Sequence, residues 1–91
     1  TNRAKEEASD HAWGIQVGAF SSRGLADQAV RSAEQTAARQ LVGAVVAISG
    51  FTGEETSVYR ARLENISQSQ ARRACEVLIA RNSPCFTYKS N

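Results

Sequence analysis

The residues with the most useful chemistry are a glutamine, two arginines and two aromatic residues that recur at alternate positions of three short segments. They are Gln16, Arg60, Arg62, Phe86 and Tyr88. A glutamine amide both donates and accepts hydrogen bonds, and a guanidinium presents forked donors that suit carbonyl and carboxylate oxygens. Aromatic rings add flat apolar surface. Together these groups predict a surface that binds a polar ligand through hydrogen bonds and ring contacts.

The sequence does not predict catalysis or metal binding. The single histidine, His11, stands alone in a polar segment, and the nine acidic residues form no evident acid–base pair. Two cysteines with one distant histidine lack the spacing of a four-ligand metal site. We therefore expect a binding module that needs no cofactor and no metal.

Hydrophobic periodicity predicts one domain with four strands. Residues 1–11 are polar and lack periodicity, so we expect a linker or flexible extension there and a domain over residues 12–91. Alternation of apolar and polar residues, or a short β-branched run, predicts strands over residues 13–20, 44–49, 56–65 and 85–89. These strands carry all five of the polar and aromatic residues named above.

Two amphipathic helices are predicted between the strands. The first covers residues 23–40 and follows the capping serines Ser21 and Ser22, and the second follows a capping box of Ser67 and Gln70. Asn82 and Pro84 end the second helix. The expected buried stripes are Leu25, Ala29, Ala33, Ala37 and Leu41, joined by Ala26 and Val30, in the first helix and Ala71, Ala74, Cys75, Leu78 and Ile79 in the second.

The order β-α-β-β-α-β predicts an α+β, ferredoxin-like (RNP-like) fold. Four antiparallel strands form one sheet, both helices cover one face, and the other face stays open. Strand parity sends the side of Val17 and Leu63 toward the helices and places Gln16, Arg60, Arg62, Phe86 and Tyr88 on the open face. The same strict alternation puts Ala19 with Val17 and Phe20 with Gln16.

The two cysteines lie ten positions apart on surfaces that should face each other. Cys75 is on the buried stripe of the second helix, and Cys85 is on the helix-facing side of the last strand. A disulfide closing so short a loop would stabilise a small domain by about 2–3 kcal/mol. The alternative is a pair of buried free thiols.

Composition excludes several classes of partner. The net charge of +2 is too small to drive polyanion binding through counterion release alone. No apolar run reaches the roughly 18 residues of a membrane span. We therefore expect neither nucleic-acid binding nor membrane insertion in this chain, and we expect a monomer.

Two strings of residues resemble the SPOR (sporulation-related repeat) domain family. The first is WGIQVGAFSS, from Trp13 to Ser22, which is similar to the (V/I)QVGAFS strand that opens these domains. The second is YRARL, from Tyr59 to Leu63, which leads into the second helix. The likeness covers about residues 12–89. It departs from the family where Val-Gly-Pro-Phe usually follows the third strand, because this chain has Leu63 to Ile66, LENI.

The resemblance implies a non-catalytic module that binds peptidoglycan. SPOR domains favour glycan strands stripped of stem peptides, concentrate at division septa and belong to exported proteins, which implies the periplasm or cell envelope. Carried over by position, the family's site residues fall on Gln16, Arg60 and Phe86. A serine of the family's site falls on Ala19, so that contact is either lost or supplied by Ser21 or Ser22 instead.

Two other functions fit the same element order. An RNA-recognition motif also carries aromatic residues on an open sheet, although the third strand here lacks its basic, glycine-rich and aromatic consensus. A protein-docking ferredoxin-like domain would use the exposed edge or the open face. Salt-sensitive RNA binding or capture of a protein partner would favour these alternatives, and sedimentation with sacculi would favour peptidoglycan.

Overall fold

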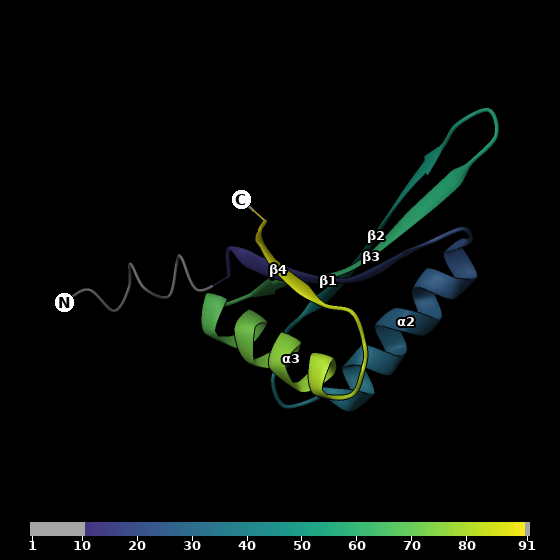
Figure 1. Ribbon diagram of the computed structural model, residues 1–91. Coiled ribbons are helices and arrows are strands. Elements are labelled where there is room, and N and C mark those ends of the chain that lie inside the picture. The colour runs from purple at the N-terminus through teal and green to yellow at the C-terminus, as the bar shows by residue number, and fades with distance from the viewer. Residues whose placement is uncertain (1–10, 91) are drawn as a thin grey trace.

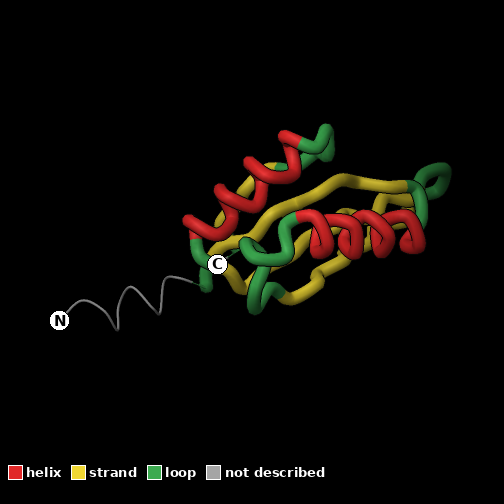
Figure 2. The backbone as a smooth tube through the Cα atoms, turned by 90° about the horizontal axis from the view of Figure 1, so that it is seen from below, coloured by secondary structure: helices red, strands yellow, loops and turns green. Residues whose placement is uncertain are grey.

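The structure, a computed structural model, describes residues 11–90 and confirms the predicted α+β fold. The elements in chain order are β1 (Trp13–Phe20), α2 (Arg23–Thr36), β2 (Val45–Thr52), β3 (Ser57–Ile66), α3 (Gln68–Ala80) and β4 (Phe86–Lys89) (Figure 1). The strands form one antiparallel sheet in the order β2-β3-β1-β4, and both helices pack on one side of it (Figure 2). The predicted linker falls almost entirely on residues 1–10, which lie outside the described residues.

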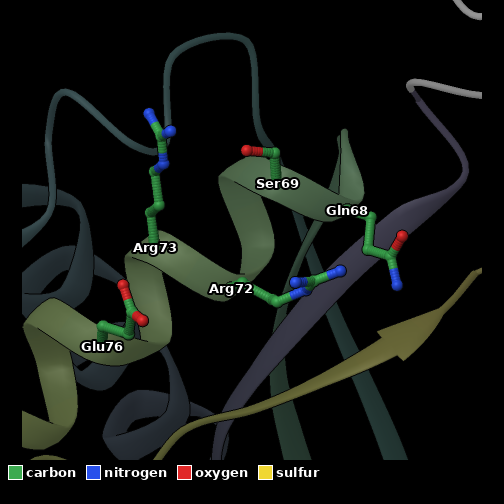
Figure 3. A pocket seen from close by; sticks show the side chains of 5 residues that line it. All are labelled: Gln68, Ser69, Arg72, Arg73 and Glu76. Atoms are coloured by element: carbon green, nitrogen blue, oxygen red, sulfur yellow. The ribbon is translucent and has the colours of Figure 1, made fainter.

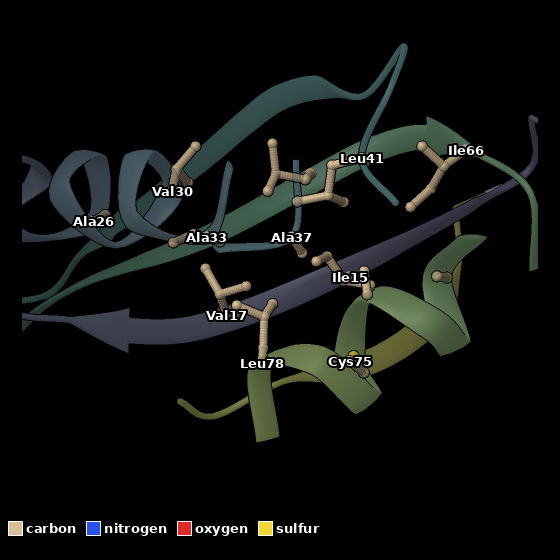
Figure 4. Close-up of a cluster of buried hydrophobic side chains, with 14 residues drawn as sticks. Ile15, Val17, Ala26, Val30, Ala33, Ala37, Leu41, Ile66, Cys75 and Leu78 are labelled. Carbon is tan, nitrogen blue, oxygen red and sulfur yellow. The ribbon is translucent and has the colours of Figure 1, made fainter. Parts of the chain in front are cut away.

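The hydrophobic core lies between the sheet and the helices (Figure 4). Its largest fully buried side chains are Ile15, Leu63, Ile66, Leu78 and Val30. The helices contribute mainly alanines to the interface, and these small side chains let the helix backbones approach the sheet closely. Because the helices cover only one face, the polar residues at the alternate strand positions are left on the other face.

Local hydrogen bonds fix the starts of both helices as predicted. The Ser22 hydroxyl accepts from the Leu25 amide at 3.2 Å, and Ser67 and Gln70 form the expected capping box. The Gln70 side chain also donates to the carbonyl oxygens of Gln40 and Val42, at 3.2 and 3.0 Å. The cap of α3 therefore also ties down the loop that enters β2.

The helix boundaries and stripes differ from the prediction at three points. Helix α2 ends at Thr36 rather than at residue 40, although turns keep Ala37 and Leu41 buried. Leu25 and Ile79 were expected in the buried stripes, but they are 46% and 58% exposed.

A β-bulge in β1 reverses the predicted parity of the last part of this strand. The register runs from Gln16 opposite Arg62 to Gly18 opposite Ala61, so Val17 and Gly18 both face the helices. Gly18 has a φ of 148°, a conformation that glycine adopts readily. As a result Phe20 packs against the core and Ala19 is exposed on the open face, the opposite of the expected placement.

The β2–β3 hairpin is longer than predicted and projects past the helix layer (Figure 1). Strand β2 continues to Thr52, beyond the expected end at residue 49, and the turn closes with a hydrogen bond from the Gly53 amide to the Thr56 carbonyl at 2.7 Å. Gly50 allows this extension, because a Cβ there would lie 2.7 Å from the ring of Tyr59. The Tyr59 ring therefore packs across the backbone of β2.

The predicted disulfide is confirmed, and it joins α3 to the short strand β4. Cys75 and Cys85 are bonded with their Cα atoms 5.1 Å apart. At the far end of β4, the Ser90 amide donates to the Ala12 carbonyl at 2.7 Å, which brings the two ends of the domain together. Neither helix within residues 11–90 is long and apolar enough to cross a membrane.

Candidate binding face of the sheet

Polar and aromatic side chains of three adjacent strands meet on the open face of the sheet. We call Gln16, Arg60, Arg62, Glu64, Phe86 and Tyr88 the binding face. Strand register brings them together, because Gln16 of β1 lies opposite Arg62 of β3 on one side and opposite Phe86 of β4 on the other. All five residues that the sequence predicted for this face are on it.

Gln16 lies at the centre of the binding face, on the side predicted from the sequence, but it is more buried than the sequence indicated. It is only 9% exposed, and its Oε1 accepts a hydrogen bond from Arg62 Nε at 2.8 Å. A buried amide needs such a partner because leaving it unpaired is costly. Gln16 is therefore placed to hold Arg62.

Arg62 is fixed on two sides. Its Nε donates to Gln16, and its guanidinium carbon lies 5.1 Å from the centre of the Tyr88 ring, a cation–π contact. Within residues 11–90 the terminal Nη groups make no hydrogen bond. The fork of Arg62 is thus oriented by the protein while its outer donors remain for a ligand.

Tyr88 lies across β1 and reaches Glu64 on β3. Its hydroxyl donates to Glu64 Oε2 at 2.5 Å. A Cβ on Gly14 would lie 3.0 Å from the Tyr88 ring and 2.8 Å from the Leu63 carbonyl, so a residue larger than glycine would displace the ring. Burial raises the pKa of Tyr88 well above its ordinary value, and the Glu64 carboxylate raises it further.

Glu64 is a residue of the face that the sequence prediction missed. The signal was present, because Glu64 continues the alternation of Arg60 and Arg62 along β3. It fell in the LENI segment that departs from the SPOR pattern, and there the likeness offered no residue to carry over. The Glu64 carboxylate accepts the hydrogen bond from the Tyr88 hydroxyl and adds negative charge beside Arg62.

Arg60 and Phe86 are the most accessible members of the binding face. Arg60 is exposed and sits between Ala19 of β1 and Ser49 of β2. Phe86 is 54% exposed, and its ring meets Tyr88 edge-on with the centroids 6.5 Å apart. These two residues therefore present a cationic fork and an apolar ring directly to solvent.

The two expected serines follow the last residue of β1, and the hydroxyl of Ser22 is engaged in capping α2. The outer end of the face instead carries Phe51, 61% exposed and directly opposite Val58. The sequence prediction missed this apolar pair because it ended β2 at residue 49.

Other hollows of the surface lie away from these residues. A hollow of about 450 Å³ runs along the outer side of α3, lined by Gln68, Ser69, Arg72, Arg73 and Glu76 (Figure 3). It belongs to the helix layer and includes none of the residues predicted to bind. Residues 11–90 contain no cluster of three or more side chains suited to hold a metal ion.

An open antiparallel sheet with ordered amide, guanidinium and aromatic groups defines a binding module. The family profile of the SPOR domain matches residues 9–89, and the chain belongs to this family. SPOR domains are non-catalytic, peptidoglycan-binding modules of cell-envelope proteins. The fold is similar to the crystal structure of the RlpA SPOR domain from Pseudomonas aeruginosa, with a TM-score of 0.57, 22% identity, and coverage of 85% of this chain and 97% of that chain. A search of curated proteins finds no match.

Proposed function

We propose that the binding face holds the glycan strands of peptidoglycan, with a preference for strands that lack stem peptides. The observation that supports this most directly is that one oriented arginine, one exposed arginine and an exposed aromatic ring lie on one open surface. Arg60 and Phe86 are exposed, and Arg62 is held by Gln16 and Tyr88. A broad open face suits a polymer that enters from the side, whereas an enclosed pocket would not.

The chemistry of a stripped glycan strand matches these groups one by one. Acetamido carbonyls accept from the Nη groups of Arg62, and the apolar faces of sugar rings pack on Phe86. The lactyl carboxyl group is an amide where a stem peptide is attached and becomes a free carboxylate once the peptide is removed. The arginines thus gain a charged partner only on stripped strands, which is the physical basis of the proposed preference.

In the cell, this activity would hold a larger exported protein at the division septum, where stripped strands gather, on the periplasmic side. The Cys75–Cys85 disulfide supports an oxidising compartment. A shallow polar surface binds modestly because it buries little apolar area, so we expect micromolar affinity or weaker, roughly −8 kcal/mol at best. The residues before Ala12 would serve as the connector to the rest of such a protein.

Co-sedimentation with purified sacculi tests the proposal. The chain should pellet more with amidase-treated sacculi than with untreated sacculi, and Arg60→Ala and Phe86→Ala should each reduce pelleting. Arg39→Ala is the matched control, because Arg39 is also exposed but lies in the loop after α2, off the binding face. Equal pelleting of the Arg60, Phe86 and Arg39 variants would refute the face as the site.

Two further assays, RNA binding at increasing salt and a protein pull-down, separate the two rival functions. An RNA-binding module would bind a homopolymer RNA with an affinity that falls steeply as salt rises. The one aromatic residue between the arginines and the β3 start, Tyr59, packs across Gly50 on the helix side and so is not available to stack on bases. A protein-docking module would ignore both polymers and retain a protein partner in a pull-down.

A further inference from the structure

The two edges of the sheet differ in how well they resist pairing with another strand. Strand β4, at one edge, has only four residues, follows Pro84 and ends at the exposed Lys89. Shortness, proline and lysine are devices that keep an edge unpaired. Strand β2, at the other edge, has eight residues, VVAISGFT, with no charged residue and no proline.

Strand β2 is also regular and accessible. It pairs with β3 in continuous register from Val45 to Thr52, whereas the β1–β3 ladder contains two irregularities. Val45, Val46 and Phe51 are 55%, 44% and 61% exposed. On the helix side, a hollow of about 420 Å³ separates the first turns of α2 from Val46 and Ile48. A straight, uncharged and uncovered edge is a template for one more strand.

We propose that β2 is a self-association surface, at which two copies of this chain pair antiparallel and extend the sheets into one of eight strands. Pairing centred on Ile48 places Val45 of one copy opposite Phe51 of the other on the open face. On the helix face it places Val46 opposite Gly50, where the Tyr59 ring already lies across the backbone. Large exposed apolar groups thus meet each other on the open face, and on the helix face Val46 meets the Tyr59 ring that covers Gly50.

Charge does not oppose the pairing of two copies. The uncharged strands meet without like-charge repulsion. The acidic turns carrying Glu54 and Glu55 fall at opposite ends of a two-fold pair, so they do not face each other. This departs from the monomer expected at first. The sequence prediction ended β2 at residue 49, before Gly50, and so did not show an eight-residue edge.

Self-pairing itself does not require glycan binding; only its consequence for glycan binding rests on the proposed function. One strand edge is a small interface, so we expect a Kd of about 0.1–1 mM for the free chain. Two copies bound to one glycan strand reach an effective concentration of about that size. Pairing would also place the two binding faces side by side on one continuous surface, so that a long glycan strand contacts both.

Sedimentation equilibrium of the chain alone, at concentrations up to roughly 1 mM, tests the proposal without any glycan. The wild-type chain should shift from monomer toward dimer, and Val46→Lys should stay monomeric because it places a lysine in the edge on the helix side, away from the binding face. Val42→Lys is the matched control, since Val42 is 70% exposed but precedes the strand, and it should dimerise as the wild type does. If Val46→Lys fails to fold, Thr52→Lys on the same face of β2 replaces it.

A wild-type chain that stays monomeric throughout, or a Val46→Lys variant that dimerises as well as Val42→Lys, overturns the proposal. Pairing with an extended peptide of another protein, without self-association, also overturns it. Sacculus pelleting of Val46→Lys keeps this result separate from the glycan proposal. When both proposals hold, Val46→Lys should be monomeric and should still pellet with sacculi, but at low chain concentration it should pellet less than the wild-type chain.

Discussion

The hydrogen bond between Gln16 and Arg62 offers the sharpest test of how the binding face is organised. Gln16 is 9% exposed, and its Oε1 accepts from the Arg62 guanidinium at 2.8 Å. A hydrogen bond to a charged group contributes about 1.5–3 kcal/mol, and the lower end applies here because Arg62 is partly exposed. We therefore expect Gln16→Ala to lower the free energy of unfolding by about 1.5 kcal/mol.

In a domain of this size, a loss of that magnitude lowers the Tm by roughly 6–12 °C. A double-mutant cycle of Gln16→Ala and Arg62→Ala, measured by denaturant unfolding, isolates the pair and should give a coupling energy of about 1–2 kcal/mol. Gln16→Ala should also weaken sacculus pelleting, although Gln16 is too buried to touch the glycan, because Arg62 then loses its orientation.

The outcome that would refute this reasoning is additivity. If the two single substitutions sum to the double substitution within about 0.5 kcal/mol, the residues act independently and Gln16 does not position Arg62. A Tm for Gln16→Ala within about 2 °C of the wild type would contradict the burial of its side chain in the same way.

Three more predictions follow from neighbouring features. Reducing the α3–β4 disulfide should lower stability by about 2–3 kcal/mol, or roughly 10–20 °C in Tm, while the variant with both cysteines replaced by alanine should melt identically with and without reductant. The pKa of Tyr88 is higher in the folded state than its ordinary value of 10.0. The protonated side chain therefore contributes its full stabilisation below pH 10, and this stabilisation is lost as the pH rises through the folded-state pKa. In an alkaline absorbance titration Glu64→Gln should therefore bring the Tyr88 midpoint back toward 10, and an unmoved midpoint would exclude the carboxylate as a cause. Gly14→Ala should displace the Tyr88 ring and cost about 1–3 kcal/mol, whereas Gly24→Ala, with no atom nearer than 4.0 Å, should be neutral or stabilising; equal effects would argue against the close contact.

The fold was predictable from the sequence because local signals agreed with one another. The two serine caps, the alternation along β3 and the alanine stripes all pointed to the same β-α-β-β-α-β order, and each is a short-range pattern. The face predicted for Gln16, Arg60, Arg62, Phe86 and Tyr88 followed from parity alone. Their roles in ligand binding remain predictions.

The errors arose where a long-range contact decides the local structure. The bulge at Gly18 depends on pairing with Ala61, which strict alternation along one strand does not contain, and so Ala19 and Phe20 were exchanged. The burial of Gln16 depends on Arg62, 46 residues away. The loop after α2 is held by the side chain of Gln70, about 30 residues further along the chain. Each of these outcomes requires the tertiary structure.

The adjacency of the two ends of the domain determines how it would carry a mechanical load. A tether joined at Ala12 pulls on β1, which is hydrogen-bonded to β3 on one side and to β4 on the other. The same strand carries Gln16, so tension along the tether reaches the centre of the binding face without passing through the helices. The projecting hairpin lies at the opposite end of the sheet and stays outside this load path (Figure 1).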